Sequence, residues 1–194
     1  GILFANTLGR YLPEQWRSGL KFCSKRILRI GIIFFGFRLT LNDVAQVGLS
    51  AVALDAIIVC STLGLGILVG KWLKMDKETT LLTSSGSAIC GAAAVLGAET
   101  TLKSEAYKTA VAVSTVVLFG TLSMFLYPLL YRNGFFPLSP REMGLYTGST
   151  VHEVAHVVGA SNAMGKDVAE VAVIVKMIRV IMLVPVLLCF SWFA

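Results

Sequence analysis

The sequence is poor in charged residues, which make up only 14% of its 194 positions. A soluble globular domain has about 25%, so this composition excludes an ordinary soluble fold. The net charge is +6, but the basic residues gather at the ends of apolar stretches, which is typical of a membrane protein and not of a nucleic-acid-binding surface. With 56% hydrophobic residues and a mean hydropathy of +0.77, the chain is predicted to cross a lipid bilayer several times.

Cysteine is also scarce, with four residues in the chain. The cysteines show no CxxC spacing and lie in or beside apolar stretches, so we expect reduced thiols and no disulfide framework. We expect no metal and no cofactor either. The four positions are Cys23, Cys60, Cys90 and Cys189.

Apolar stretches alternate with short charged links along the whole chain, which predicts an all-α polytopic membrane protein with one transmembrane domain over residues 1–194. The apolar stretches are residues 27–41, 44–70, 79–98, 109–131, 144–160 and 168–193. If each of them crosses, the links on one side carry eleven Lys and Arg against three on the other, which predicts that the richer side is cytoplasmic. Whether residues 79–98 cross fully or re-enter stays open.

The sequence contains an internal repeat at an offset of 62 residues, with repeat-like units at residues 82–131 and 144–193. Each unit has a small-residue helix led by Gly-Ser, a short polar link and a long apolar helix. Composition alone could produce several of the matching letters, but their order recurs. We expect the two units to superpose, and to share an orientation if every stretch crosses.

Short, glycine-interrupted segments at matching places in two repeats are typical of a transporter binding site. A helix that starts inside the membrane has unpaired N–H groups and a positive dipole end, and an anion satisfies both. We therefore predict substrate-facing helix starts in both units, although serine there is also ordinary capping or packing. The predicted residues are Ser84, Ser85, Gly86, Ser87, Gly148, Ser149 and Thr150.

His152, Glu153 and His156 stand in a stretch that otherwise reads as membrane-embedded. Ionisable groups cost about 2.5–3.5 kcal/mol or more there and usually face a cavity or a partner. We expect His152 to face the interior, and His152 with Glu153 to bind substrate or to carry the coupling proton. A purely structural polar cluster remains an alternative.

The letters HEVAH at residues 152–156 also match the HExxH pattern, so a membrane-embedded zinc metalloprotease is the second hypothesis. Such a site needs a third ligand. The only acids downstream are Asp167 and Glu170, and we expect both in the link before the last helix, at the membrane edge.

Three other ionisable residues interrupt apolar stretches. Lys176 and Arg179 share one face of the last predicted helix, where they either snorkel to the interface or supply the counter-charge of an anion site. Asp55 lies near the middle of an apolar helix. It is either a coupling residue or a buried partner of Arg38 or a neighbouring hydroxyl.

Three motifs, at residues 29–40 (RIGIIFFGFRLT), 87–95 (SAICGAAAV) and 148–155 (GSTVHEVA), resemble the YeiH-type family of bacterial inner-membrane proteins. Those proteins are described as sulfate exporters, so the resemblance implies a multi-pass secondary transporter in the inner (plasma) membrane that exports a small anion such as sulfate or a sulfonate. It also implies a relation to cation–proton antiporter and bile-acid symporter folds.

The resemblance has two departures. Family members are longer at both ends, which implies that this chain is part of a longer transporter. They also carry Gln where this chain has His156, which argues against a zinc ligand there. The substrate, the direction of transport, the coupling ion and the oligomeric state stay open.

Overall fold

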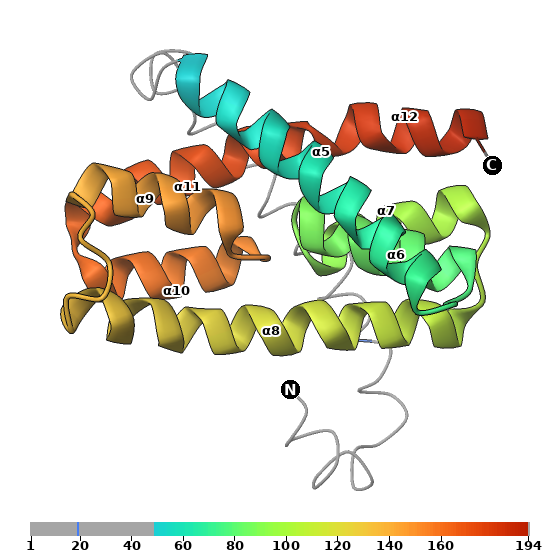
Figure 1. Ribbon diagram of the computed structural model, residues 1–194, viewed down its shortest axis with the longest axis horizontal. Coiled ribbons are helices and arrows are strands. Elements are labelled where there is room, and N and C mark those ends of the chain that lie inside the picture. The colour runs from blue at the N-terminus through green and yellow to red at the C-terminus, as the bar shows by residue number, and fades with distance from the viewer. Residues whose placement is uncertain (1–18, 20–48, 194) are drawn as a thin grey trace, which may run out of the picture. The chain divides into compact units, whose positions relative to one another are not determined.

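The computed structural model describes residue 19 and residues 49–193, and the labels of Figure 1 are used from here on. The part of the chain that is described is helical throughout, which confirms the all-α prediction. The first apolar stretch, residues 27–41, and Arg38 lie outside the described residues. The helices are α5 (Leu49–Trp72), α6 (Lys77–Ala88), α7 (Ala92–Leu102), α8 (Ala106–Arg132), α9 (Pro140–Thr150), α10 (Val154–Met164), α11 (Lys166–Ile181) and α12 (Leu183–Phe193).

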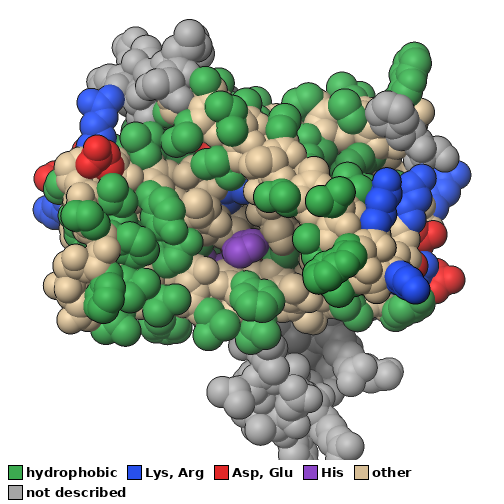
Figure 2. Space-filling view, viewed as in Figure 1, with side chains coloured by type: hydrophobic (Ala, Val, Ile, Leu, Met, Phe, Trp, Pro, Cys, Tyr) green, Lys and Arg blue, Asp and Glu red, His purple; other side chains and the backbone are tan. Residues whose placement is uncertain are grey.

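Within the described residues, three helical segments are long and apolar enough to cross a membrane: Ala51–Trp72, Ala106–Arg132 and Lys166–Trp192. They contain 22, 27 and 27 residues, and at about 1.5 Å per residue each can span about 30 Å of hydrocarbon. The third joins α11 to α12 across a break at Met182, where Pro185 has no N–H to donate to the preceding turn. Figure 2 shows hydrophobic side chains over the middle of the face and charged side chains at its two ends, as a membrane protein requires.

Helices α6 and α7 form a hairpin beside the first half of α8. Leu82 of α6, Val95 of α7 and Ala112 of α8 pack into one buried cluster. If residues 79–98 formed one continuous helix, Leu82 and Val95 would lie too far apart along it to share this cluster. The start of α6 lies at the start of α8, where Lys108 pairs with Glu78 at 2.9 Å. The chain turns at residues 89–91, helped by a positive φ of 70° at Gly91. Residues 79–98 therefore re-enter and do not cross.

Helices α9 and α10 form a second hairpin, beside the other half of α8 (Figure 1). Ser139 and Glu142 form a capping box at the start of α9. After α8 the chain turns back, and α9 runs antiparallel to it (Figure 1). Tyr127 of α8 donates to Thr150 at the end of α9. Arg132 at the end of α8 donates to the carbonyl of Ala163 at the end of α10, so α10 runs parallel to α8. The turn lies at residues 151–153.

The two hairpins enter from opposite ends of α8, and their turns meet in the middle (Figure 1). The offset that relates the sequences also relates the helix bounds: Ala92–Leu102 becomes Val154–Met164, and the last residue of α6, Ala88, becomes the last residue of α9, Thr150. Each unit is thus a hairpin followed by a spanning segment. The spanning segments run in opposite directions. Helix α8 leads from the first hairpin to the second, whereas the other segment starts with α11 beside α9 and ends with α12 beside α7.

The condition under which the two units were expected to share an orientation is therefore not met. That condition was that every apolar stretch crosses, whereas each hairpin returns to the side from which it entered. The links at residues 71–78 and 99–108 consequently lie on one side with five Lys and Arg, and those at residues 132–143 and 161–167 lie on the other with three. The predicted grouping, in which the links at residues 71–78 and 132–143 share the cytoplasmic side, is therefore wrong. Among the described links, the side with residues 71–78 and 99–108 carries more positive charge.

Candidate functional site

The candidate site lies where the turns of the two hairpins touch. A Cβ atom placed on Gly91 would lie 3.4 Å from the Cβ of Glu153 and 3.5 Å from the carbonyl oxygen of His152. Two interruptions of helix that are 62 residues apart in sequence are thus in van der Waals contact. Each leaves backbone groups that need partners inside an apolar protein.

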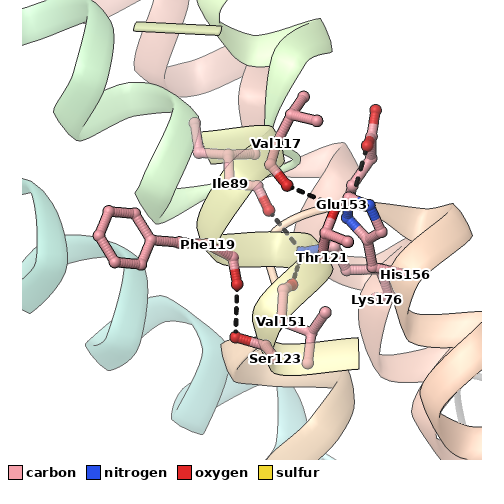
Figure 3. A network of polar contacts seen from close by, with 9 residues as sticks. All are labelled: Ile89, Val117, Phe119, Thr121, Ser123, Val151, Glu153, His156 and Lys176. Atoms are coloured by element: carbon pink, nitrogen blue, oxygen red, sulfur yellow. Dashed lines mark hydrogen bonds and ion pairs between the residues drawn. The ribbon is translucent and has the colours of Figure 1, made fainter. Parts of the chain in front are cut away.

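Lys176 supplies one of those partners to each hairpin. Its Nζ atom donates to the carbonyl oxygen of Ile89 at 2.8 Å and to that of Val151 at 2.7 Å (Figure 3). Ile89 and Val151 are the C-terminal capping residues of α6 and α9, so the ammonium group lies at two negative helix ends, where a cation is stabilised. The Lys176 side chain has no exposed surface, and it links the two hairpin turns.

Arg179, one turn further along α11, binds the first hairpin only. Its Nε atom donates to the carbonyl oxygen of Ala88 at 2.6 Å, and its Nη2 atom donates to that of Ser87 at 3.2 Å. The residue is 1% exposed, and its Nη1 atom is buried without a hydrogen-bond partner. The alternative in which Lys176 and Arg179 snorkel to the membrane interface is therefore wrong, because their face of α11 points at the hairpin turns.

The predicted serine and glycine positions are at helix ends and not at helix starts, so that prediction was wrong. Gly86 and Ser87 lie in the last turn of α6, and the second set lies in the last turn of α9. Hydroxyl groups in both sets donate hydrogen bonds to backbone carbonyls of the preceding turn. In the first set, Ser85 donates to the carbonyl of Leu82 at 2.8 Å. The members of the second set do the same, Ser149 to Leu145 and Thr150 to Tyr146.

The glycines of these segments allow close packing of helices, which was the alternative to substrate binding in the sequence analysis. A Cβ on Gly148 would lie 2.5 Å from the carbonyl oxygen of Ala172, and a Cβ on Gly86 would lie 2.5 Å from a methyl group of Val95. Ser84 packs where α6 approaches Gly66 of α5. These small residues let the hairpins approach α11 and each other.

The helix starts that do lie at the site are those of α7 and α10. Their N-cap residues, Gly91 and Glu153, make no side-chain capping bond. The first N–H groups of a helix have no partner within it and carry a partial positive charge. The positive ends of α7 and α10 therefore lie at the touching hairpin turns, as do the two buried cations. Sequence reasoning missed Gly91, whose signal was its position at the turn of the first repeat.

His152 lies in the turn between α9 and α10. The residue is half-buried and its Nδ1 atom is buried without a hydrogen-bond partner. The positive charges of Lys176 and Arg179 act on its ring. Figure 2 shows a histidine recessed in the middle of the face, between hydrophobic side chains.

The Glu153 carboxylate lies beside His156, whose Nδ1 atom makes no hydrogen bond among the described residues. One carboxylate oxygen of Glu153 lies 3.5 Å from Nδ1 of His156, and Nε2 of His156 lies 3.3 Å from the Thr121 hydroxyl (Figure 3). Because that hydroxyl donates to the carbonyl of Val117, the histidine must donate its Nε2 proton to Thr121. The imidazole ring fits because it lies directly against Gly120.

The HExxH letters do not form the helical pair that a zinc site requires. Helix α10 begins at Val154, so His152 stands outside the helix that carries His156. Asp167 and Glu170 are exposed in the first turns of α11 and not in the link before it. Within the described residues, no three His, Cys, Asp or Glu side chains are close enough together to hold a metal ion.

Asp55 completes the charged residues at the centre. It lies on α5 and has no exposed surface, and in the described part of the chain neither carboxylate oxygen has a hydrogen-bond partner. The charges of Arg179 and, to a lesser extent, Lys176 act on it. Its suggested pairing with Arg38 involves a residue outside the described part of the chain.

The chain belongs to the family described as Conserved hypothetical protein 698, whose model matches residues 1–194. It is 65% identical over 188 residues to a UPF0324 membrane protein of Bacteroides thetaiotaomicron, covering 97% of this chain and 56% of that protein. A UPF0324 membrane protein of Bordetella bronchiseptica is 48% identical, with 97% and 59% covered. One of Wolinella succinogenes is 53% identical, with 90% and 53% covered.

The chain thus spans a little over half the length of the curated relatives that it matches. This membership agrees with the YeiH-type resemblance, and the relatives' descriptions identify membrane proteins. No solved structure matches the chain.

Proposed function

We propose that this chain forms the substrate-binding core of a secondary transporter for a small anion, with sulfate and sulfonates as the first candidate substrates. The observation that carries the proposal is the pair of buried cations, Lys176 and Arg179, at the point where the two hairpin turns meet. The relatives' names go no further than membrane protein, so the substrate class comes from the chemistry of the site and from the family resemblance.

The electrostatics favour an anion. A buried cation is costly unless it is paired, and backbone carbonyls offset only part of the charge of Lys176 and Arg179. The unpartnered Nη1 atom of Arg179 is a donor from a planar fork that suits the oxygens of a sulfate or sulfonate group. The uncapped starts of α7 and α10 add two further positive ends. His152 provides a ring nitrogen beside them.

The inverted arrangement of the hairpins suits alternating access. Transporters built from inverted repeats bind substrate between interrupted helices near the middle of the membrane and expose it to each side in turn. Here each hairpin enters from one side, and Lys176 is bonded to both turns. Releasing the bond to Val151 would free the second hairpin while the first stays bound. Freeing the first hairpin would also require release of Arg179 from Ala88 and Ser87. The core would thereby open to one side at a time.

The test is exchange of radiolabelled sulfate by the full-length protein in proteoliposomes. We expect Lys176→Gln to abolish exchange, because an uncharged amide removes the cation that both turns share. The matched control is Lys166→Gln, an exposed lysine at the start of the same helix, which should exchange sulfate like the unmodified protein. Equal exchange by the two variants, or competition by none of several sulfonates and oxyanions, would exclude this proposal.

A further inference from the structure

The structure leaves one carboxylate at the site without an assigned partner. Asp55 is fully buried in the first half of α5, and among the described residues neither of its oxygens has a hydrogen-bond partner. Burying an ionised carboxylate unpaired is expensive, and the usual solutions are a hydrogen-bonded ion pair or a proton. No carboxylate of the described residues forms an ion pair within 4 Å of Lys176 or Arg179, the two cations whose charges act on Asp55.

The cations are held elsewhere. Lys176 and Arg179 together donate four hydrogen bonds to carbonyl oxygens at the hairpin turns. Asp55 therefore balances their charge through space without being bound to them. Such a carboxylate can gain or lose a proton without breaking any bond that holds the fold. Glu153 differs in having a titratable neighbour, since one of its oxygens lies 3.5 Å from Nδ1 of His156.

We propose that Asp55 is the exchangeable counter-anion of the Lys176–Arg179 pair, so that binding of the substrate anion is coupled to uptake of one proton by the Asp55 carboxyl group. The inference rests on the proposed function and names its coupling group. With the site empty, ionised Asp55 offsets one of the two positive charges. When an anion arrives beside the cations, its charge adds to that of Asp55, and protonation of Asp55 removes the repulsion. The proton leaves again when the anion does.

Other titratable groups also lie near the two cations. Cys90, at the turn of the first hairpin, and Glu153 act electrostatically on Lys176, and His152 and Tyr127 lie within reach of the pair. Helices α6 and α9 also pack against α5. Their described charged residues are near the outer ends, and α9 also carries Tyr146, which stacks on Tyr127. The groups that act on Asp55 itself are Arg179 and Lys176 of α11.

The experiment is equilibrium binding of radiolabelled sulfate to the purified full-length protein between about pH 5 and pH 8. Coupling to one proton predicts that, above the pH at which Asp55 ionises, affinity falls about tenfold per pH unit. Asp55→Asn should bind sulfate with the same affinity at every pH, since the neutral amide mimics the protonated acid. Asp55→Glu should keep the slope. Asp167→Asn, the same change at an exposed position of α11, is the matched control and should also keep it.

The outcomes separate this inference from the proposed function. A slope that survives in Asp55→Asn, or that disappears in Glu153→Gln instead, overturns the role of Asp55 while anion binding stands. Absence of sulfate binding at any pH in the unmodified protein removes the sulfate proposal and this inference with it. If Asp55→Asn does not fold, proton uptake by the unmodified protein decides: sulfate should draw about one proton per bound anion from a weakly buffered solution, and no uptake overturns the coupling.

Discussion

Packing of α9 against α11 holds the second hairpin in place, and Gly148→Ala tests it directly. A Cβ at residue 148 would lie 2.5 Å from the carbonyl oxygen of Ala172 and 2.8 Å from the Cβ of Val175. Both are well inside normal contact distance. The first neighbour is backbone, so neither helix can relieve the overlap by rotating a side chain. The hairpin or α11 must shift as a body.

The magnitude follows from a comparison with Gly64→Ala. Gly64 is in the interior of α5, is exposed, and has nothing within 4 Å of its Cβ position. Both variants gain the same helix propensity, about 1 kcal/mol, so that term cancels in the difference. What remains is the overpacking cost at residue 148, about 1–3 kcal/mol. For 150–250 residues this corresponds to a melting temperature about 2–12 °C lower for Gly148→Ala than for Gly64→Ala.

The assay is thermal unfolding of the two purified variants in the same detergent, followed by intrinsic tryptophan fluorescence and by retention of the monodisperse peak. Gly148→Ala should unfold first, and Gly64→Ala should match or exceed the unmodified protein. Equal melting temperatures for the two variants would refute the close contact between α9 and α11, and with it the position of the second hairpin turn over Lys176.

Two further predictions concern stability. His156→Gln should fold like the unmodified protein, because its amide can still donate to Thr121, whereas His156→Leu should lose about 1–3 kcal/mol in a denaturant titration by leaving buried polar groups unpaired; equal stability would contradict the Thr121 contact. The N–H of Thr79, bonded to Asp76 at 2.8 Å, lowers the pKa of that carboxyl below its ordinary 3.8, so the cap stabilises α6 above that value and is lost as pH falls through the lowered pKa. In melting temperatures measured down the pH scale, Asp76→Ala should therefore remove an acid-dependent decline, and an unchanged decline would show that the cap is not its source.

The sequence was sufficient for those features that composition and local letters determine. Few charges and long apolar runs require helices in a bilayer, because only they satisfy the backbone there. The offset of 62 residues located both interruptions, since Ser87–Gly91 and Ser149–Glu153 carry the turns of the two hairpins. His152, Lys176 and Arg179 stood out by their cost in an apolar stretch, and the structure brings all three to the centre.

What the sequence could not determine is how the chain continues after each interruption. A turn at Gly91 and a kink at Gly91 have the same letters; the difference lies in whether Val95 packs beside Leu82 or far beyond it. Because the chain turns back after each interruption, the serines lie at helix ends and not at helix starts. For the same reason, the two repeat units have opposite orientations. The contacts of Lys176 were hidden for a similar reason. Its partners are the carbonyls of Ile89 and Val151, and no side chain at those positions signals a backbone acceptor.

The two repeat units have matching helices, but the buried cations are found in only one of them. At the offset of 62 residues, Lys176 corresponds to Ser114 and Arg179 to Val117, so the spanning helix of the first unit has no cations at these places. The second unit therefore supplies both buried cations, and Lys176 shares its charge with the first unit through Ile89. Its two bonds have nearly equal lengths, 2.8 and 2.7 Å, and each satisfies one orphan carbonyl. Opening the second hairpin would break one of these bonds, whereas opening the first would also break the two bonds of Arg179 to Ala88 and Ser87. On the proposed transport function, the two openings therefore differ in cost.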